Sequence, residues 1–250
     1  MPTALIVEDE PEANKLLAML VQLRGYRTAS AFNGSEALAK IQSESPDVVF
    51  LDLMLPDVNG YTICSDLKSR KATAVIPVVI VTARVADENR ERCFALGADD
   101  FVAKPYTPDE IFKALDESAR WTERIDEELA SSGFEVLSGD ESDTARNLGR
   151  LLNLLLARTP LDRDAVLRIG TCLRRFFESA DAWGRRHDVT RVATFRHQAF
   201  PDRIEFQLQD HAGWLLSGEA PPAEDPAFTE SHRHEDPRSI TWIIRFEASS

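Results

Sequence analysis

The sequence has no long hydrophobic run. Its longest candidate, 75–81, is interrupted by Pro77 and falls far short of the roughly 20 apolar residues that a transmembrane helix needs. The N-terminal segment turns acidic early and contains neither a basic region nor a small-residue cleavage site, so it does not resemble a signal peptide. We therefore expect a cytoplasmic protein that does not associate with a membrane.

Cysteine is scarce, and no two cysteines have a paired spacing. Cys64, Cys93 and Cys172 stand singly in the chain, which favours reduced thiols over a disulfide framework or a zinc site. His232 and His234 have no neighbouring ligand set with metal-binding spacing. We expect these two histidines to form a solvated pair on a loop.

Net positive charge is also missing. The formal net charge is -13 at pH 7, and acidic residues outnumber basic ones in both halves. No helix-turn-helix is evident, and the arginines between 163 and 175 lie at scattered helical angles among acidic neighbours. Because nonspecific DNA affinity depends on a basic surface, these features argue against DNA binding.

The first half of the chain alternates short apolar runs with amphipathic stretches. This pattern predicts an α/β fold in which helices wrap a parallel sheet. The expected strands are 4–7, 27–29, 48–51, 78–81 and 101–103, and the expected helices are 11–23, 35–43, 59–69, 86–96 and 108–121. The last of these helices opens with Thr107-Pro108-Asp109-Glu110, the pattern of a capping box.

A length of 250 residues favours two domains, because single domains usually contain about 100 to 150 residues. The fifth helix can extend beyond 121, and Ser131, Ser132 and Gly133 are typical of a connection or turn. We therefore predict a first domain over 1–122, a helical extension or linker over 123–133, and a second domain over 134–250.

Acidic residues follow two of the expected strands. Glu8 and Asp9 come after the first strand and Asp52 after the third, and the carboxyl ends of the strands in a doubly wound sheet meet in one crevice. Three neighbouring carboxylates repel one another, and a hard divalent cation with oxygen ligands relieves that repulsion. The sequence predicts a Mg²⁺ site at this edge of the sheet.

The residues after the fourth and fifth strands complete a phosphoryl-transfer site. Asp52 can attack phosphorus as a nucleophile because the cation and Lys104 offset the negative charge of the donor. Thr82 has a hydroxyl that can reach a phosphoryl oxygen once phosphate is present, and Phe101 lies where an aromatic ring could rotate inward. Asp52, Lys104 and Thr82 are the expected catalytic residues, with Thr82 and Phe101 as a switch.

Five motifs in order resemble the receiver domain of two-component response regulators. They are Glu8-Asp9, Asp52-Leu-Met-Leu-Pro-Asp-Val-Asn-Gly60, Val81-Thr-Ala83, Leu96-Gly-Ala-Asp-Asp100 and Lys104-Pro105. The resemblance covers about half the chain. It implies a flavodoxin-like, five-stranded, doubly wound sheet and a cis peptide bond before Pro105. It also implies Mg²⁺ bound through Glu8, Asp9, Asp52 and the Met54 carbonyl, and tuning of the phosphate lifetime by Met54 and Arg84.

The second half predicts an α+β domain, with helices early and a sheet after them. The expected strands are 134–137, 189–197, 203–209 and 240–246, and the expected helices are 142–157 and 162–181. This order, together with the segments 200–206, 210–214, 225–228 and 236–240, resembles the ATP-binding domain of anti-sigma factor serine kinases, which is related to histidine-kinase ATPase domains. An unrelated α+β interaction domain is the alternative.

The resemblance fails at the residues that would bind nucleotide. It places Arg175 and Ser179 where working members carry a glutamate and a metal-binding asparagine. Asp210 retains the adenine-binding aspartate, but Ala212 replaces a glycine, and the lid at 237–240 has no glycine. A backbone without glycine cannot easily approach a triphosphate. We expect a degenerate, non-catalytic domain that binds a protein partner.

These features predict a response regulator of a phosphorelay. A histidine kinase or phosphotransfer protein would phosphorylate Asp52, and the faces formed by 85–96 and 111–121 would then change contacts, by releasing or masking the second domain or by pairing two receivers as a homodimer. The downstream partner would be a protein, in the manner of sigma-factor control. The alternatives are a phosphorylation-gated ATPase or serine kinase and a transcriptional regulator.

Overall fold

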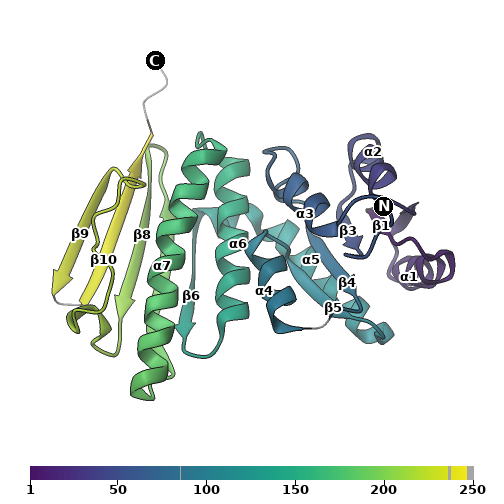
Figure 1. The fold of residues 1–250 in the computed structure, drawn as a ribbon. Helices are drawn as coiled ribbons and strands as arrows, with labels where there is room; N and C mark the ends of the chain where they lie inside the picture. The colour runs from purple at the N-terminus through teal and green to yellow at the C-terminus, as the bar shows by residue number, and fades with distance from the viewer. Residues whose placement is uncertain (85, 236–237, 247–250) are drawn as a thin grey trace. The chain divides into compact units, whose positions relative to one another are not determined.

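The computed structural model describes residues 1–84, 86–235 and 238–246. The chain divides into two compact units between Arg124 and Ile125, and each unit is described by itself (Figure 1). Among the described residues, no helix is both long and apolar enough to cross a membrane.

The first unit is built on a parallel five-stranded sheet with the strand order β2-β1-β3-β4-β5. The strands are β1 (Thr3–Val7), β2 (Arg27–Ala31), β3 (Val48–Leu51), β4 (Val78–Thr82) and β5 (Asp100–Ala103). The helices are α1 (Pro11–Leu23), α2 (Gly34–Glu44), α3 (Gly60–Lys68), α4 (Asp87–Ala95) and α5 (Pro108–Ala130), and the residues of α5 from Ile125 onward belong to the second unit. The α/β fold expected from the sequence is confirmed.

Alternate strand residues face opposite sides of this sheet. On one side Ile6, Phe50 and Val81 pack in a buried cluster with Leu17 of α1 and Ile111 of α5. The intervening strand residues, such as Leu5 and Leu51, are also fully buried. Because both faces are covered, the strands read as nearly continuous apolar runs.

Local signals start the helices where the sequence predicts. Asn59 accepts the Tyr61 N–H at the start of α3. Before α5, the Thr107 N–H donates to Glu110 at 2.7 Å and the Glu110 N–H donates to the Thr107 hydroxyl at 3.4 Å. The capping box is therefore present. The peptide bond between Lys104 and Pro105 is cis, as the receiver resemblance implies.

The second unit contains an antiparallel five-stranded sheet with the order β6-β7-β8-β10-β9. Its strands are β6 (Ser131–Leu137), β7 (Arg191–Ala199), β8 (Arg203–Asp210), β9 (Glu230–Glu235) and β10 (Arg238–Arg245), and its helices are α6 (Glu141–Arg158), α7 (Arg163–His187) and the short 3-10 helix η1 (Trp214–Leu216). Helices α6 and α7 lie side by side (Figure 1).

Aromatic side chains join α7 to the sheet of this unit. Phe177 of α7 packs edge-on against Phe134 of β6 and Phe195 of β7, and Phe176 packs against Trp242 of β10. These rings are the largest apolar groups available, and their burial contributes a large share of the stabilisation of a small domain. The α+β architecture expected for this half is confirmed.

Three expectations about the second unit were wrong in detail. Ser131, Ser132 and Gly133 form the start of β6 and not a turn; a Cβ at Gly133 would lie 2.4 Å from the Phe195 carbonyl oxygen, so this glycine allows a close strand approach. Helix α7 continues beyond 181 to His187. His232 and His234 lie on β9, an exposed edge strand whose polar sequence hides its strand character.

His197 of β7 connects the sheet to the last turns of α5. The residue is only 6% exposed, and Nε2 lies 2.7 Å from the Glu128 carbonyl oxygen. Because a carbonyl only accepts, Nε2 carries a hydrogen. Burial lowers the pKa of His197, so the neutral ring is favoured in the folded protein.

Acidification below pH about 6.5, the ordinary histidine pKa, should therefore destabilise the second unit. Below this pH the histidine takes up a proton in the unfolded chain but not in the folded protein, where its pKa is lower. The free energy of unfolding therefore decreases as the pH falls from about 6.5 through the lower pKa of the folded state. Tryptophan fluorescence during urea unfolding measures this, because three of the four tryptophans, Trp183, Trp214 and Trp242, lie in this unit. His197→Gln should flatten the pH dependence.

His234→Gln, on the exposed strand β9, is the matched control and should leave the pH dependence as in the wild type. If acidification lowered the free energy of unfolding equally in the wild type and in His197→Gln, the role assigned to His197 would be contradicted.

Candidate functional site

The candidate site lies where four parallel strands end. Glu8 follows β1, Asp52 follows β3, Thr82 ends β4 and Lys104 follows β5. Backbone hydrogen bonds fix these ends to one another: the Asp52 N–H donates to the Val7 carbonyl and the Lys104 N–H to the Thr82 carbonyl, each at 2.9 Å. The parallel register thus brings side chains far apart in the sequence to one edge of the sheet.

Three carboxylates gather at this edge. Glu8, Asp9 and Asp52 each present an oxygen, and these atoms lie within 4.8 Å of one another. Glu8 and Asp52 are buried and Asp9 is exposed. Burial raises the pKa of Glu8, although Lys104 opposes this shift. Carboxylate oxygens are the ligands that Mg²⁺ takes in proteins, so the residues present fit a divalent cation.

Lys104 bridges two of these carboxylates. Its Nζ lies 2.5 Å from Glu8 Oε2 and 2.5 Å from Asp52 Oδ2. Burial alone would lower the pKa of Lys104, but the hydrogen bonds to Asp52 and Glu8 outweigh this effect and the pKa is raised. The ammonium group therefore stays charged and offsets negative charge at the side chain of Asp52.

Asp52 is oriented by its own loop. Its Oδ1 accepts the Met54 N–H at 3.0 Å while Oδ2 accepts from Lys104. Gly60 lies against the same segment, where a Cβ would come within 2.5 Å of the Asp52 carbonyl oxygen. Only glycine allows this approach, and it explains the Gly60 of the motif that follows the acidic residue.

The expected switch residues lie on neighbouring strands. The Thr82 side chain is fully buried, and its hydroxyl accepts a long hydrogen bond of 3.4 Å from the Arg84 N–H. Phe101 is half-buried on β5 and pairs with Ile80, two residues before Thr82. Val85, which begins the expected face 85–96, lies outside the described residues.

Two supporting residues were missed by the sequence reasoning. Asn14 is buried on the inner face of α1, and its Nδ2 donates to the Glu8 carbonyl at 3.2 Å. Asp57 accepts the N–H groups of Gly34 and Ser35, which joins the loop after Asp52 to the start of α2. These hydrogen bonds lower the pKa of Asp57, and the one from Gly34 has the largest effect. A polar residue at an apolar helix position was the one available signal, at Asn14.

Tyr61, the second residue of α3, contacts α4. Its hydroxyl donates to Asn89 Oδ1 at 2.9 Å, and the Arg92 guanidinium lies 4.3 Å from the ring centroid. Tyr61 directly follows Gly60, which touches the Asp52 backbone. Gly60 and Tyr61 therefore connect the Asp52 backbone to α4.

In the second unit, side chains at the expected nucleotide-site positions form hydrogen bonds and ion pairs with other groups of the protein. Asp210 is buried, and its carboxylate accepts backbone N–H groups of the loop that follows it, those of Ala212, Gly213, Trp214 and Leu215. The side chain of Asp210 thus stabilises a turn of its own chain.

Ser179 and Arg175 of α7 are likewise engaged. The Ser179 hydroxyl donates to the Glu219 carbonyl at 3.1 Å and accepts from Trp214 Nε1 at 3.3 Å. Arg175 pairs with Asp225 at 3.1 Å. Trp214, fully buried, joins Ser179 to the Asp210 loop. Of the expected lid, Pro237 lies outside the described residues, and the lid residues from Arg238 onward belong to β10.

Comparisons with known proteins agree with this architecture for the first unit. The family described as "Response regulator receiver domain" matches residues 4–116. The "DNA-binding response regulator MtrA" of Mycolicibacterium smegmatis is 30% identical over 206 residues, which cover 80% of this chain and 87% of that protein.

Other relatives match over shorter lengths. The "DNA-binding dual master transcriptional regulator RpaA" of Synechocystis is 34% identical over 138 residues, 55% of this chain and 56% of that protein, so the chain spans about half of that relative. The chemotaxis response regulator CheY4 of Vibrio cholerae has a solved structure with 26% identity and a TM-score of 0.45, covering 47% of this chain and 98% of that one. The chain belongs to the response regulators of two-component signalling, and residues 4–116 are its receiver domain.

Proposed function

We propose that this response regulator accepts a phosphoryl group on Asp52 and, as a result, changes the protein contacts of its second unit. The observation that carries the proposal is the grouping of Asp52 with Glu8, Asp9 and Lys104, in which an ammonium lies 2.5 Å from the carboxylate that would react. An uncompensated carboxylate would repel a phosphoryl donor.

The chemistry follows from the positions of these groups. An Asp52 carboxylate oxygen forms a bond to phosphorus as the bond from phosphorus to the donor atom breaks, and the leaving group takes the electron pair. Lys104 then pairs with a phosphoryl oxygen. Glu8, Asp9, Asp52 and the Met54 carbonyl would hold Mg²⁺, which when bound offsets charge on the transferred phosphoryl group. The product is an acyl phosphate.

The donor would be a histidine kinase or a phosphotransfer protein, because receiver domains take their phosphoryl group from phosphohistidine. Thr82 would move toward the new phosphoryl oxygens, and Phe101 would turn inward as Thr82 leaves its place. The change would reach residues 86–96 and 111–121, while Met54 and Arg84 would set the lifetime of the phosphate. Pairing of two receivers is one way in which these faces could be used.

Incubation of the full chain with acetyl phosphate and Mg²⁺ tests phosphoryl uptake. Intact mass spectrometry should show one added phosphoryl group, and borohydride reduction, which converts an aspartyl phosphate to homoserine, should place it at residue 52. Absence of the adduct with Mg²⁺ present, or its location at another residue, would contradict the proposal.

For the second unit we propose a degenerate ATPase-type domain that binds a protein, with a sigma-factor-related protein as the expected kind of partner. The support is local. The Asp210 carboxylate accepts hydrogen bonds from the backbone of its own loop. Ser179 is hydrogen-bonded to Trp214 and Glu219, and Arg175 forms an ion pair with Asp225. An adenine or a metal ion would have to displace these internal partners.

The catalytic alternative, a phosphorylation-gated ATPase or serine kinase, can be tested by titration with ATP. Isothermal titration of the full chain with ATP and Mg²⁺ should give no saturable heat, even at millimolar ATP. The wild type should also fail to release phosphate from ATP after treatment with acetyl phosphate. Micromolar affinity for ATP would instead support the enzyme.

A transcriptional regulator is the second candidate function, and the relatives favour it. MtrA and RpaA are described as DNA-binding, and the match to MtrA extends beyond the receiver domain. Against it, α7 buries Val166, Ile169 and Phe176 along its length, and the chain is strongly acidic. A gel-shift assay with random-sequence duplex DNA at low salt decides between the two: retention of DNA by the phosphorylated chain would support the transcriptional regulator.

A further inference from the structure

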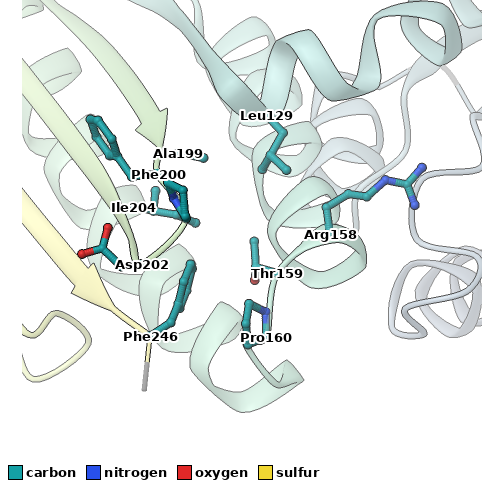
Figure 2. Close-up of a pocket in the computed structure, with 10 residues that line it drawn as sticks. Leu129, Arg158, Thr159, Pro160, Ala199, Phe200, Asp202, Ile204 and Phe246 are labelled. Atoms are coloured by element: carbon teal, nitrogen blue, oxygen red, sulfur yellow. The ribbon is translucent and has the colours of Figure 1, made fainter. Parts of the chain in front are cut away.

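The second unit contains a hollow that the proposed function does not use. Its volume is about 470 Å³, within the roughly 300 to 1,000 Å³ of pockets that hold small molecules. It lies among the end of α5, the loop between α6 and α7, the β7–β8 hairpin and the residue that follows β10 (Figure 2). The apolar lining residues are Leu129, Pro160, Ala199, Phe200, Pro201, Ile204 and Phe246.

The polar side chains around the hollow already have partners. Thr159 donates to the Leu155 carbonyl at 2.6 Å and accepts the Leu161 N–H at 3.2 Å. Asp202 pairs with Arg203 at 3.0 Å. Arg158 lies 3.8 Å from Asp126, and Figure 2 shows its guanidinium extending away from the hollow. Each charged side chain of the lining already has an oppositely charged partner, so none offers an unpaired charge to a ligand.

From this we infer that the hollow is a binding site for a small uncharged aromatic molecule. The walls supply aromatic and aliphatic contacts and their charged side chains are paired, so affinity would come from removing apolar surface of the ligand from water. An aromatic ring in this space would contact Phe246 and Ile204 on one side and Leu129 on the other (Figure 2).

A ligand here would act on the end of α5. Leu129 belongs to the last turns of that helix, and Glu128 beside it accepts the hydrogen bond from His197 of β7. Ala199, two residues along the same strand, has its side chain on the same face as His197. Filling the hollow therefore adds packing at the point where α5 meets the sheet. Binding in the hollow does not depend on Asp52, so this inference can be tested independently of the proposed function.

The test uses indole as the probe and the methyl signals of Leu129, Ala199 and Ile204 in the full chain as the readout. Saturable shifts of these signals should appear with indole and not with benzoate, an aromatic molecule that carries a negative charge. Ala199→Phe should fill the hollow and weaken binding about tenfold or more. Gln198→Phe, the adjacent exposed position on the other face of β7, should bind indole as the wild type does.

Asp52→Asn should also bind indole unchanged, which separates this site from the phosphoryl-acceptor site. To guard against misfolding, Ala199→Phe is first required to show cooperative thermal unfolding, and Leu129→Ala serves as a second variant that should weaken binding by removing a wall. Shifts that do not saturate, or equal affinity in Ala199→Phe and Gln198→Phe, would overturn the inference.

Discussion

Asp52→Asn should abolish phosphoryl uptake from acetyl phosphate, while Asp66→Asn should leave it within about twofold of the wild type. The amide that replaces the Asp52 carboxylate keeps its size and shape, so the loop that contacts Gly60 and the Met54 N–H can stay in place. What is lost is the nucleophilic oxygen and the negative charge that holds Lys104 at 2.5 Å. Asp66 pairs with Arg70 on the exposed side of α3 and tests for nonspecific effects of removing a carboxylate.

The measurement is the fraction of chain that carries one added phosphoryl group after a fixed time, by intact mass. Circular dichroism of both variants should match the wild type, so that loss of uptake reports chemistry and not unfolding. Undiminished uptake by Asp52→Asn would mean that another residue accepts the phosphoryl group, and the site built around Asp52 would have to be abandoned.

Much of the first unit was predictable because local pattern and tertiary structure agree there. The apolar run that forms β3 is buried on both sides and was predicted with the bounds that the structure has, and the residues after β1, β3 and β5 meet as a parallel sheet requires. Asn14 and Asp57 were not predicted as supports of the site. Their hydrogen bonds reach backbone groups that come close only when the sheet and α2 are assembled.

The second unit shows where local pattern is insufficient. The long helices α6 and α7 were predicted because their apolar residues repeat at helical spacing over many turns. Strand β9 was missed because both its faces are mostly exposed, which removes the alternation that marks a strand. The role of Trp214, which donates a hydrogen bond to Ser179 from the 3-10 helix η1, depends on contacts that no local pattern encodes.

Lys68→Met should destabilise the receiver domain by about 3 to 5 kcal/mol, the cost of breaking a buried ion pair from one side. Lys68, at the end of α3, lies 2.7 Å from Asp99, and both side chains are at most 3% exposed. The ammonium also donates to the carbonyls of Ala74 and Ile76. Methionine has a similar length but no donor, so it leaves the Asp99 carboxylate buried without its cation and both carbonyls without this partner.

Urea unfolding followed by circular dichroism, together with amide hydrogen exchange in β4 and β5, measures the loss. Lys113→Met is the control, because Lys113 is exposed and lies 3.8 Å from Glu117, a geometry worth less than about 0.5 kcal/mol. The double variant Lys68→Met with Asp99→Leu should recover part of the loss, since replacing both charges removes the isolated carboxylate. If Lys68→Met were no more destabilising than Lys113→Met, the pair would be a marginal contact. Asp99 also accepts the Val78 N–H at 2.9 Å, so the pair connects the residue before β5 to the start of β4. These are the two strands that end at Thr82 and lead to Lys104.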